Sequence, residues 1–455
     1  MKRLLVIAYA VPPTRGASPG RVGHLIRHLP AHGWEAVVLT PRHPERVVTA
    51  EKTREHRNYP IPLRLVHDGG GVPYWLQETG FQELFAGLRK AAGPPAAAEQ
   101  TPGLYGKRAI DPEAQALEDP PVPKWAWQRL IVTAQSNPDH RAGWVEPGLQ
   151  AARAVAQALR LDAVYSLSPP VTAHRIAMRA AENLGIPWIA EERERWRGSG
   201  VALVDARRRS RILRAARAIG CLHPERLRAK VYRGRATRIR PSFDPRDLGG
   251  APSVPRKLPL VAMHAGPTSV GGRDTGILLE ALRMLLDSGT IGGEEIRVRL
   301  IGSRDPGLAA AIGSLRLGGI VTLEPEMPWP LSLATQQDAS LLLAALGPGD
   351  AGRFPDRFLD ALTVGRRLLA FGPADAATAS FLRESGVGSH HPDSSSLASA
   401  LADRIRAEQS GRTDQPEWDE EVIAPFRAER VVAEIVRLIE AGPGKRAEDG
   451  AGVRL

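Results

Sequence analysis

"VIAYAVPPTRGASPGRVGHLIRHLPAHGWEAVVLTP", residues 6–41, contains an apolar run, a loop rich in proline and glycine, an amphipathic segment and a second apolar run. The runs around Leu4–Ala8 and 35–41 have the length of strands, and the segment from Arg21 to Ala31 has helical periodicity. Two strands that flank a helix are the start of a βαβ unit. The stretch therefore predicts an α/β fold with a parallel sheet.

The same alternation of strands and helices continues after residue 145 and begins again after residue 258. A chain of 455 residues exceeds the size at which one hydrophobic core usually suffices. We therefore predict two doubly wound Rossmann-like domains that face one another across a cleft. Their bounds are 1–240 with an irregular Pro- and Ala-rich insertion at 42–125, a linker at 241–257, a second domain at 258–440 and a flexible tail at 441–455.

The composition excludes several classes of protein. A single cysteine, Cys221, rules out a disulfide framework and a cysteine cluster for a metal. The N-terminal apolar run is shorter than the core of a signal peptide, and no run approaches the roughly 18 apolar residues that span a bilayer. His24, His28 and His32 recur at helical spacing, but no further ligand accompanies them. We expect a cytoplasmic protein without a bound metal.

The loop of residues 12–20 places Gly16 and Gly20 between a strand and a helix, where backbone N–H groups can receive an anion. Its glycine spacing is not that of the dinucleotide fingerprint, and the second strand ends at Pro41 without the acid that binds a ribose. No Gly-Lys-Ser/Thr follows any glycine-rich loop. These features disfavour nicotinamide, flavin and P-loop enzymes, while the alternative that the two glycines only form the turn stays open.

Five blocks of the sequence resemble blocks of bacterial glycosyltransferases of the GT-B class, glycosyltransferase family four. They are "AYAVPPTRGASPGR…LPAHGWEAVVLT", "NPDHRAGW" (137–144), "DAVYSLSPPVTAHRIA" (162–177), "GIPWIAEERERW" (185–196) and "GRFPDRFLDALTVGRRLLAFGP" (352–373). The resemblance covers most of the chain outside 42–125. It implies transfer of a sugar with retention of configuration, from a nucleoside-diphosphate sugar in the C-terminal domain to an acceptor in the N-terminal domain, without metal or cofactor. Gly16, Gly20 and Arg21 would then hold the phosphate or acceptor end of the cleft.

The resemblance also implies donor-binding residues. The loop "HAGPTSVGGR" provides Gly266, Gly272 and Arg273, and backbone amides with a fixed cation suit a diphosphate leaving group. Arg357 and Asp360 stand where the family has a lysine near the phosphates and a glutamate on the ribose hydroxyls. Two alternatives remain, in which Arg273 is a solvated loop residue and Arg357 and Asp360 form an ordinary exposed helix pair.

In the N-terminal domain the resemblance points to three catalytic candidates. Glu191 and Glu194 stand in place of two aspartates of the family, and either one would orient the acceptor hydroxyl. The alternative is that they neutralise Arg193 and Arg195. His174 follows a strand end that faces the predicted cleft, and its unperturbed pKa near neutrality suits acid–base chemistry. The alternative for His174 is a position on the helix surface.

The net charge of +11 is concentrated in one stretch of the chain. Residues 193–240 hold 16 basic and three acidic side chains, a local balance of +13. Within it "DARRRSRILRAAR", Asp205–Arg217, predicts a basic amphipathic helix with Arg207, Arg211 and Arg214 in one stripe and an apolar stripe that includes Ile212. Such a helix can rest on an anionic membrane beside a lipid-linked acceptor. The alternative is a solvated arginine-rich face.

We therefore expect a metal-independent, retaining glycosyltransferase whose acceptor is a cell-envelope glycan, a lipid carrier or a small molecule. Its localisation is cytoplasmic, with peripheral attachment to the membrane as the alternative. The altered residues at 191–195 and 357–360 keep a second hypothesis open, a GT-B-like binding or scaffold protein without catalysis. A third class, nucleic-acid binding, is favoured only by the positive charge. No zinc finger, RNP motif or aromatic platform in the sequence supports it. We expect no nucleic-acid partner.

Overall fold

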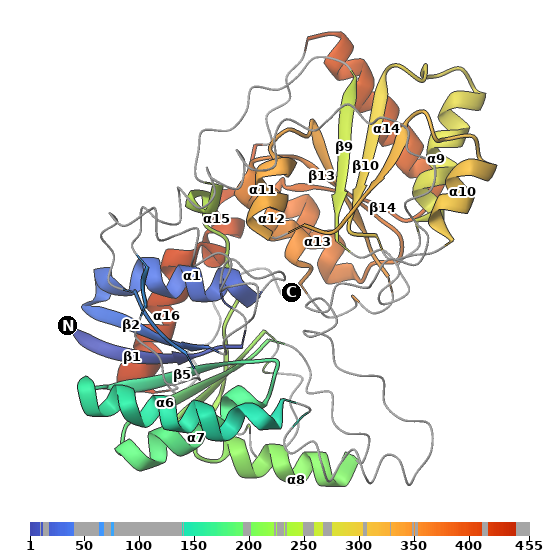
Figure 1. Ribbon diagram of the computed structural model, residues 1–455. Helices are drawn as coiled ribbons and strands as arrows, with labels where there is room; N and C mark the ends of the chain where they lie inside the picture. Colours follow the sequence, from blue (N-terminus) through green and yellow to red (C-terminus); the bar gives the residue numbers. More distant parts are fainter. Residues whose placement is uncertain are drawn as a thin grey trace, which may run out of the picture. The chain divides into compact units, whose positions relative to one another are not determined.

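The computed structural model divides the chain into two α/β units, each built on its own sheet (Figure 1). The first unit contains the described residues up to Arg240 and those from Ala428 onward, and the second contains Pro241–Arg427. No helix in the described ranges combines the length and the apolar character that a membrane crossing requires. The described residues are 1–9, 11, 18–40, 63–67, 74–76, 139, 141–193, 202–222, 224, 232, 234–248, 259–266, 275–303, 307–327, 329–347, 350, 354–411 and 417–442.

The sheet of the first unit has the order β4-β3-β2-β1-β5-β6-β7-β8, and all neighbours are parallel except β3 and β4. The direction of winding reverses between β1 and β5, which makes this the switch point of a doubly wound sheet. β3 and β4 lie within 42–125, so the sheet continues into the segment for which we expected irregular structure. The strands are β1 (Lys2–Ile7), β2 (Trp34–Thr40), β3 (Leu63–His67), β4 (Tyr74–Leu76), β5 (Ala163–Ser168), β6 (Trp188–Glu192), β7 (Ala218–Cys221) and β8 (Ala236–Arg238).

Helices cover both faces of this sheet. Alternate side chains of β1 point to opposite faces, so Leu4 and Val6 pack with α1 and α16, whereas Leu5 and Ile7 pack with α6, α7 and α8. All four side chains are fully buried, as expected for a parallel strand covered on both sides. The helices are α1 (Ser18–His28), α6 (Val145–Ala158), α7 (Thr172–Leu184), α8 (Ala202–Leu213) and α16 (Ala428–Ala441), with short 3₁₀ turns η1 (Leu29–His32) and η2 (Ala142–Trp144).

The second unit repeats this winding in an all-parallel sheet of order β11-β10-β9-β12-β13-β14, with its switch point between β9 and β12. Its strands are β9 (Leu260–Ala265), β10 (Ile296–Ile301), β11 (Val321–Glu324), β12 (Leu341–Ala345), β13 (Leu368–Phe371) and β14 (Gly388–His391). Its helices are α9 (Gly276–Asp287), α10 (Leu308–Ser314), α11 (Trp329–Gln336), α12 (Asp356–Val364), α13 (Ala376–Ser385), α14 (Ser394–Gln409) and α15 (Glu420–Ile423), with 3₁₀ turns η5 (Pro245–Leu248) and η7 (Ala424–Phe426). Helices α9 and α14 pack on one face, and α12 and α13 on the other.

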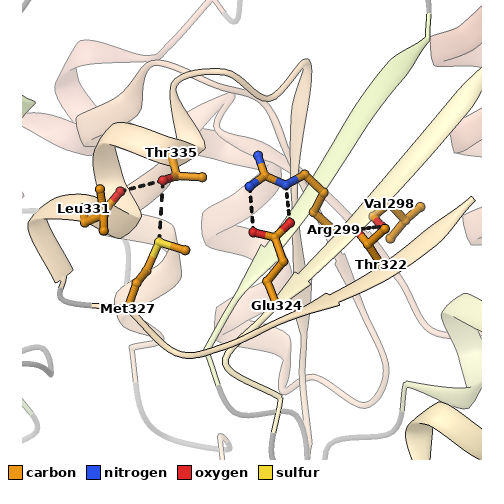
Figure 2. Close-up of polar contacts among 7 residues, drawn as sticks. All are labelled: Val298, Arg299, Thr322, Glu324, Met327, Leu331 and Thr335. Atoms are coloured by element: carbon orange, nitrogen blue, oxygen red, sulfur yellow. Dashed lines mark hydrogen bonds and ion pairs between the residues drawn. The ribbon is translucent and has the colours of Figure 1, made fainter. Parts of the chain in front are cut away.

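Side chains also hold the edge strand β11 to β10 (Figure 2). Arg299 of β10 donates through Nε and Nη2 to the two carboxylate oxygens of Glu324, with an Nη2–Oε2 distance of 2.7 Å. Thr322 Oγ1 donates to the carbonyl of Val298 at 3.3 Å. Opposite charges across neighbouring strands typically contribute about 0.2–1 kcal/mol. The bidentate pair therefore supports the register of an edge strand that, among the described strands, pairs with β10 alone.

Helix α16 belongs to the first unit, although the predicted domain bounds place it in the second. Val431, Val432 and Ile435 are fully buried against β1 and α1 of the first unit. The sequence pattern predicts that 258–440 lies wholly in the second domain. The helical periodicity of this segment predicts an apolar face, but not which sheet that face covers. Within the described residues, the chain consequently passes from the first unit to the second at Arg240–Pro241 and back at Arg427–Ala428.

The first part of the predicted linker, 241–257, is ordered within the second unit. Phe243 forms a parallel bridge with Arg427, and its N–H donates to the carbonyl of Phe426 at 2.9 Å. The Arg427 guanidinium lies 5.5 Å from the centre of the Phe243 ring. Phe243 and Leu248 are buried. The rest of this linker, like 443–455 of the predicted tail, lies outside the described residues.

Candidate functional site

In doubly wound sheets, ligands bind beyond the carboxyl ends of the strands at the switch point. The residues to consider therefore lie at the ends of β1 and β5 in the first unit and of β9 and β12 in the second. The two places carry Arg21 and Arg357, each of which is a predicted site residue.

Arg357 bridges the two strands at the switch point of the second unit. It extends from α12, and its Nε and Nη1 donate to the carbonyls of Ala265 and Ala345, both at 3.3 Å. These are the last residues of β9 and β12. Gly266 follows with φ of +117°, and a Cβ at this position would lie 3.4 Å from Arg357 Nη2. The structure thus brings Gly266 and Arg357 together, with a fixed cation beside a residue that has no side chain.

Asp360 lies on the same helix and is bound by a tryptophan. Trp329 of α11 donates from Nε1 to Asp360 Oδ1 at 3.1 Å. Burial raises the pKa of Asp360 to about 7, against the opposing effects of the Trp329 hydrogen bond and the Arg357 charge. A carboxyl group with this pKa is half protonated near neutral pH, and both of its forms can hydrogen-bond to a hydroxyl. Trp329 was not predicted, because a lone tryptophan 31 positions away gives no signal of the contact.

Four predicted site residues lie outside the described residues. They are Gly16 of the opening loop, Glu194, and the two donor-loop residues Gly272 and Arg273. Gly20 is described and is buried near the start of α1. Within the described residues, no group of three or more His, Cys, Asp or Glu side chains is arranged to hold a metal ion.

Arg21 and Glu191 form a buried ion pair at the switch point of the first unit. Arg21 Nε lies 3.2 Å from the Glu191 carboxylate, and Arg21 Nη2 donates to the carbonyl of Arg240. The hydroxyl of Tyr165 on β5 donates to the second oxygen of Glu191. Burial and the charge of Glu191 raise the pKa of Tyr165. Arg21 is thus engaged by groups of the protein itself, and Glu191 pairs with Arg21 rather than with Arg193.

The next residue, Glu192, belongs to a separate network on the opposite face of the sheet. Neighbouring residues of a strand point to opposite faces, so Glu191 faces α1 and Glu192 faces α8. Arg209 of α8 donates to the two oxygens of Glu192 at 3.1 and 2.9 Å, and the Tyr232 hydroxyl donates at 2.8 Å. Arg209 also lies over the Tyr232 ring. This carboxylate was not among the predicted site residues, and its contacts hold α8 against the sheet.

His174 is fully buried in the core of the first unit. Trp188 Nε1 donates to Ser166 Oγ (2.8 Å), and Ser166 Oγ also lies within hydrogen-bond distance of His174 Nδ1 (2.8 Å). Burial, assisted by the charge of Arg209, lowers the pKa of His174 to about 3. The expected alternative of a surface position is wrong, and the buried ring is not accessible to a reactant in this structure.

The burial of His174 predicts a measurable acid sensitivity. The unfolded chain binds a proton at this residue below about pH 6.5, whereas the folded chain does so only near pH 3. Its contribution to stability is therefore lost as the pH falls through this window, by up to about 1.4 kcal/mol per pH unit. Urea unfolding at a series of pH values should show a shallower dependence for His174→Gln than for the wild type. His32→Gln, at an exposed position, should show the same pH dependence of stability as the wild type. If the stability of both variants depended on pH as that of the wild type does, the burial of His174 would be contradicted.

Described residues of the block 137–144 contact Tyr9, which follows β1, and the start of α7. Asp139 accepts bonds from the Thr172 N–H at 2.8 Å and from its hydroxyl at 2.6 Å. The Arg141 guanidinium lies 5.1 Å from the centre of the Tyr9 ring, and the Trp144 ring meets Tyr9 edge-on at 5.6 Å. The structure thus gives this block a positioning role beside the β1–β5 switch point.

Comparison with solved structures finds the same architecture over nearly the whole chain. Sucrose-phosphate synthase from Thermosynechococcus elongatus is 12% identical with a TM-score of 0.55, over 96% of this chain and 98% of that one. HepE from Anabaena in complex with UDP is 13% identical with a TM-score of 0.54, over 97% and 100%. A glycosyltransferase from Rickettsia africae is 10% identical with a TM-score of 0.53, over 96% and 98%. No protein-family model matches the chain, and no curated protein matches it. These likenesses concern architecture, and the chain has the GT-B fold.

Proposed function

We propose that this protein is a retaining glycosyltransferase of the family-four type, which transfers a sugar from a nucleoside-diphosphate sugar. The acceptor is a cell-envelope glycan, a lipid-linked molecule or a small molecule. The sequence blocks and the GT-B fold support this proposal, as do the UDP and UDP-glucose complexes of HepE, a neighbour in fold. The observation that carries it is the position of Arg357, fixed between the ends of β9 and β12 beside Gly266.

The proposed chemistry requires stabilisation of a departing diphosphate. Negative charge builds on the leaving group as the glycosidic bond breaks, and a preorganised cation stabilises it without reorganisation. Arg357 provides that cation, and it would supply fixed positive charge without a metal ion. Since Gly266 has no side chain, nothing at this position covers the guanidinium. Asp360 is assigned to the ribose hydroxyls. We assign the reaction to the cytoplasm, where the buried thiol of Cys221, which forms no disulfide, would stay reduced.

A thermal-shift panel of UDP, GDP, ADP and dTDP sugars tests donor binding. A ligand at 100 times its dissociation constant stabilises the native state by about 2.7 kcal/mol, so the correct donor should raise the unfolding temperature by several degrees. Arg357→Ala should abolish this rise. Arg383→Ala, which removes an exposed arginine from α13 of the same unit, should retain it. A rise of equal size in all three proteins would remove Arg357 from the donor site.

A turnover assay distinguishes a glycosyltransferase from a binding or scaffold protein with the same fold. Release of the nucleotide in the presence of candidate acceptors, with the anomeric configuration of the product read by NMR, tests both transfer and retention. A donor that binds in an Arg357-dependent manner without any turnover would favour the binding or scaffold protein. Inversion of configuration would contradict the family-four assignment.

A further inference from the structure

Helices α7 and α8 pack against each other on one face of the first sheet and carry a concentration of arginine (Figure 1). Together they contain six arginines and two acidic residues. Arg175 and Arg179 are four positions apart on α7, and Arg208 and Arg211 are three apart on α8, so each pair lies on one side of its helix. All four are at least partly exposed. We call these four residues the α7–α8 arginine face.

The guanidinium groups of this face repel one another. The pKa of Arg175 is lowered, first by partial burial and then by the positive charges of Arg179, Arg211 and Arg208. Charges on two different helices affect one group in this way only if they lie close together. Arg179 and Arg211 form no ion pair with any residue that the structure describes. At Arg179 and Arg211, the face therefore carries positive charge that no described acidic residue pairs with.

The structure also limits the ways in which α8 can bind a membrane. The sequence predicted a basic amphipathic helix that rests on an anionic membrane, but its apolar residues Ile212, Leu213 and Ala216 are buried in the core of the first unit. Arg209 is held by Glu192 inside the protein. The described part of α8 thus has no apolar side left for insertion. Attraction at this face has to be electrostatic.

We propose that the α7–α8 arginine face binds the phosphate headgroups of an anionic lipid bilayer, without insertion of the helix. A basic residue near an anionic membrane surface increases the partition coefficient roughly fivefold. Neither α7 nor α8 contains Phe, Tyr or Trp, on which the bases of a single-stranded nucleic acid would stack. The lipid surface, which needs only charge, is therefore favoured over a single-stranded nucleic acid. This binding does not depend on the proposed transfer reaction.

Cosedimentation with vesicles tests the proposal. The full-length protein should bind vesicles of phosphatidylglycerol and phosphatidylcholine at low ionic strength, leave them as salt is added, and ignore pure phosphatidylcholine. The double variant Arg179→Gln/Arg211→Gln should reduce the partition coefficient roughly 30-fold. An unchanged thermal unfolding midpoint confirms that the variant is folded.

A matched control distinguishes vesicle binding at this face from an effect of the protein's net charge. Arg383→Gln/Arg406→Gln removes the same charge from two exposed arginines of the second unit, and it should leave vesicle binding within about twofold of the wild type. An equal loss in both double variants would overturn the proposal, as would equal binding to neutral vesicles. Binding to duplex DNA that needs Arg179 and Arg211, with no binding to vesicles, would also overturn it and assign the face to nucleic acid.

Discussion

Arg21→Met is expected to lower the free energy of unfolding of the first unit by about 3–5 kcal/mol, the usual cost of breaking a buried ion pair. The substitution leaves the Glu191 carboxylate, which is 2% exposed, with the Tyr165 hydroxyl as its remaining described partner. Water cannot replace the missing cation at so buried a site. For a unit of this size, such a loss corresponds to a fall of roughly 10 °C in unfolding temperature. Thermal unfolding measured by circular dichroism checks the result.

A double-mutant cycle distinguishes pairing from packing. Arg21→Met/Glu191→Met replaces both charges by apolar side chains and should be more stable than Arg21→Met, because no carboxylate is left buried without its cation. Lys2→Met removes the cation of an ion pair whose members are 56% and 45% exposed, so it should cost less than about 1 kcal/mol. If Arg21→Met costs no more than Lys2→Met, the pair is not buried in solution.

The same double variant tests the catalytic hypothesis for Glu191. If the folded protein retains turnover when Glu191 is replaced by methionine, the carboxylate has a structural role only. If turnover is lost while the donor still raises the unfolding temperature, a role at the acceptor is supported. The destabilised single variant cannot make this distinction, because loss of activity and loss of folding coincide in it.

Gly372→Ala is expected to destabilise the second unit by about 3 kcal/mol or more. Gly372 follows β13 with φ of +96°, a conformation that costs a residue with a side chain about 1–3 kcal/mol. A Cβ at this position would lie 2.5 Å from the carbonyl oxygen of Leu346. The obstacle is main chain, and β12 and β13 are joined beside it by the Leu346 N–H bond to Phe371 at 2.8 Å. Relief therefore requires displacement of a strand end, which adds a further cost.

Gly365→Ala is the matched control for this prediction. Gly365 ends α12 with φ of +72°, and nothing lies within 4 Å of the position that a Cβ would take. It therefore carries only the cost of the left-handed conformation, about 1–2 kcal/mol. Urea unfolding should rank the proteins as wild type, Gly365→Ala and Gly372→Ala in order of falling stability. Equal losses in the two variants would show that the close approach to Leu346 is absent in solution.

The fold could be predicted from the sequence because the pattern that indicates it lies in short segments of the chain. Short apolar strands alternate with amphipathic helices in both halves, and this pattern alone indicates two doubly wound sheets. The packing of α16 on the first unit could not be predicted in this way. Val431 and Ile435 show that one side of the helix is apolar, but not which of two apolar sheets it covers. Long-range packing decides between such equivalent partners, and periodicity carries no information about it.

The candidate site was predictable to a smaller extent. Gly266 and Arg357 are far apart in the chain, and the family resemblance singled out both, but only the structure brings them together. The burial of His174 had a local signal, because His174, Ala177 and Ala181 stand at helical spacing on the apolar side of α7. The pairing of Arg21 with Glu191 had none, since opposite charges on distant elements have many alternative partners. Residue type indicated the chemistry, and tertiary contacts decided which groups remain accessible.

The return of α16 to the first unit also affects the order in which the protein can fold during its synthesis. The core beneath α1 contains Val431, Val432 and Ile435, which a ribosome adds only after Pro241–Arg427 of the second unit has been translated. Until then Leu4, Val6 and Val22 lack part of their cover. The second unit, whose described core lies within one continuous segment, can complete its folding first. The N-terminal half of this chain is therefore the last to become fully native.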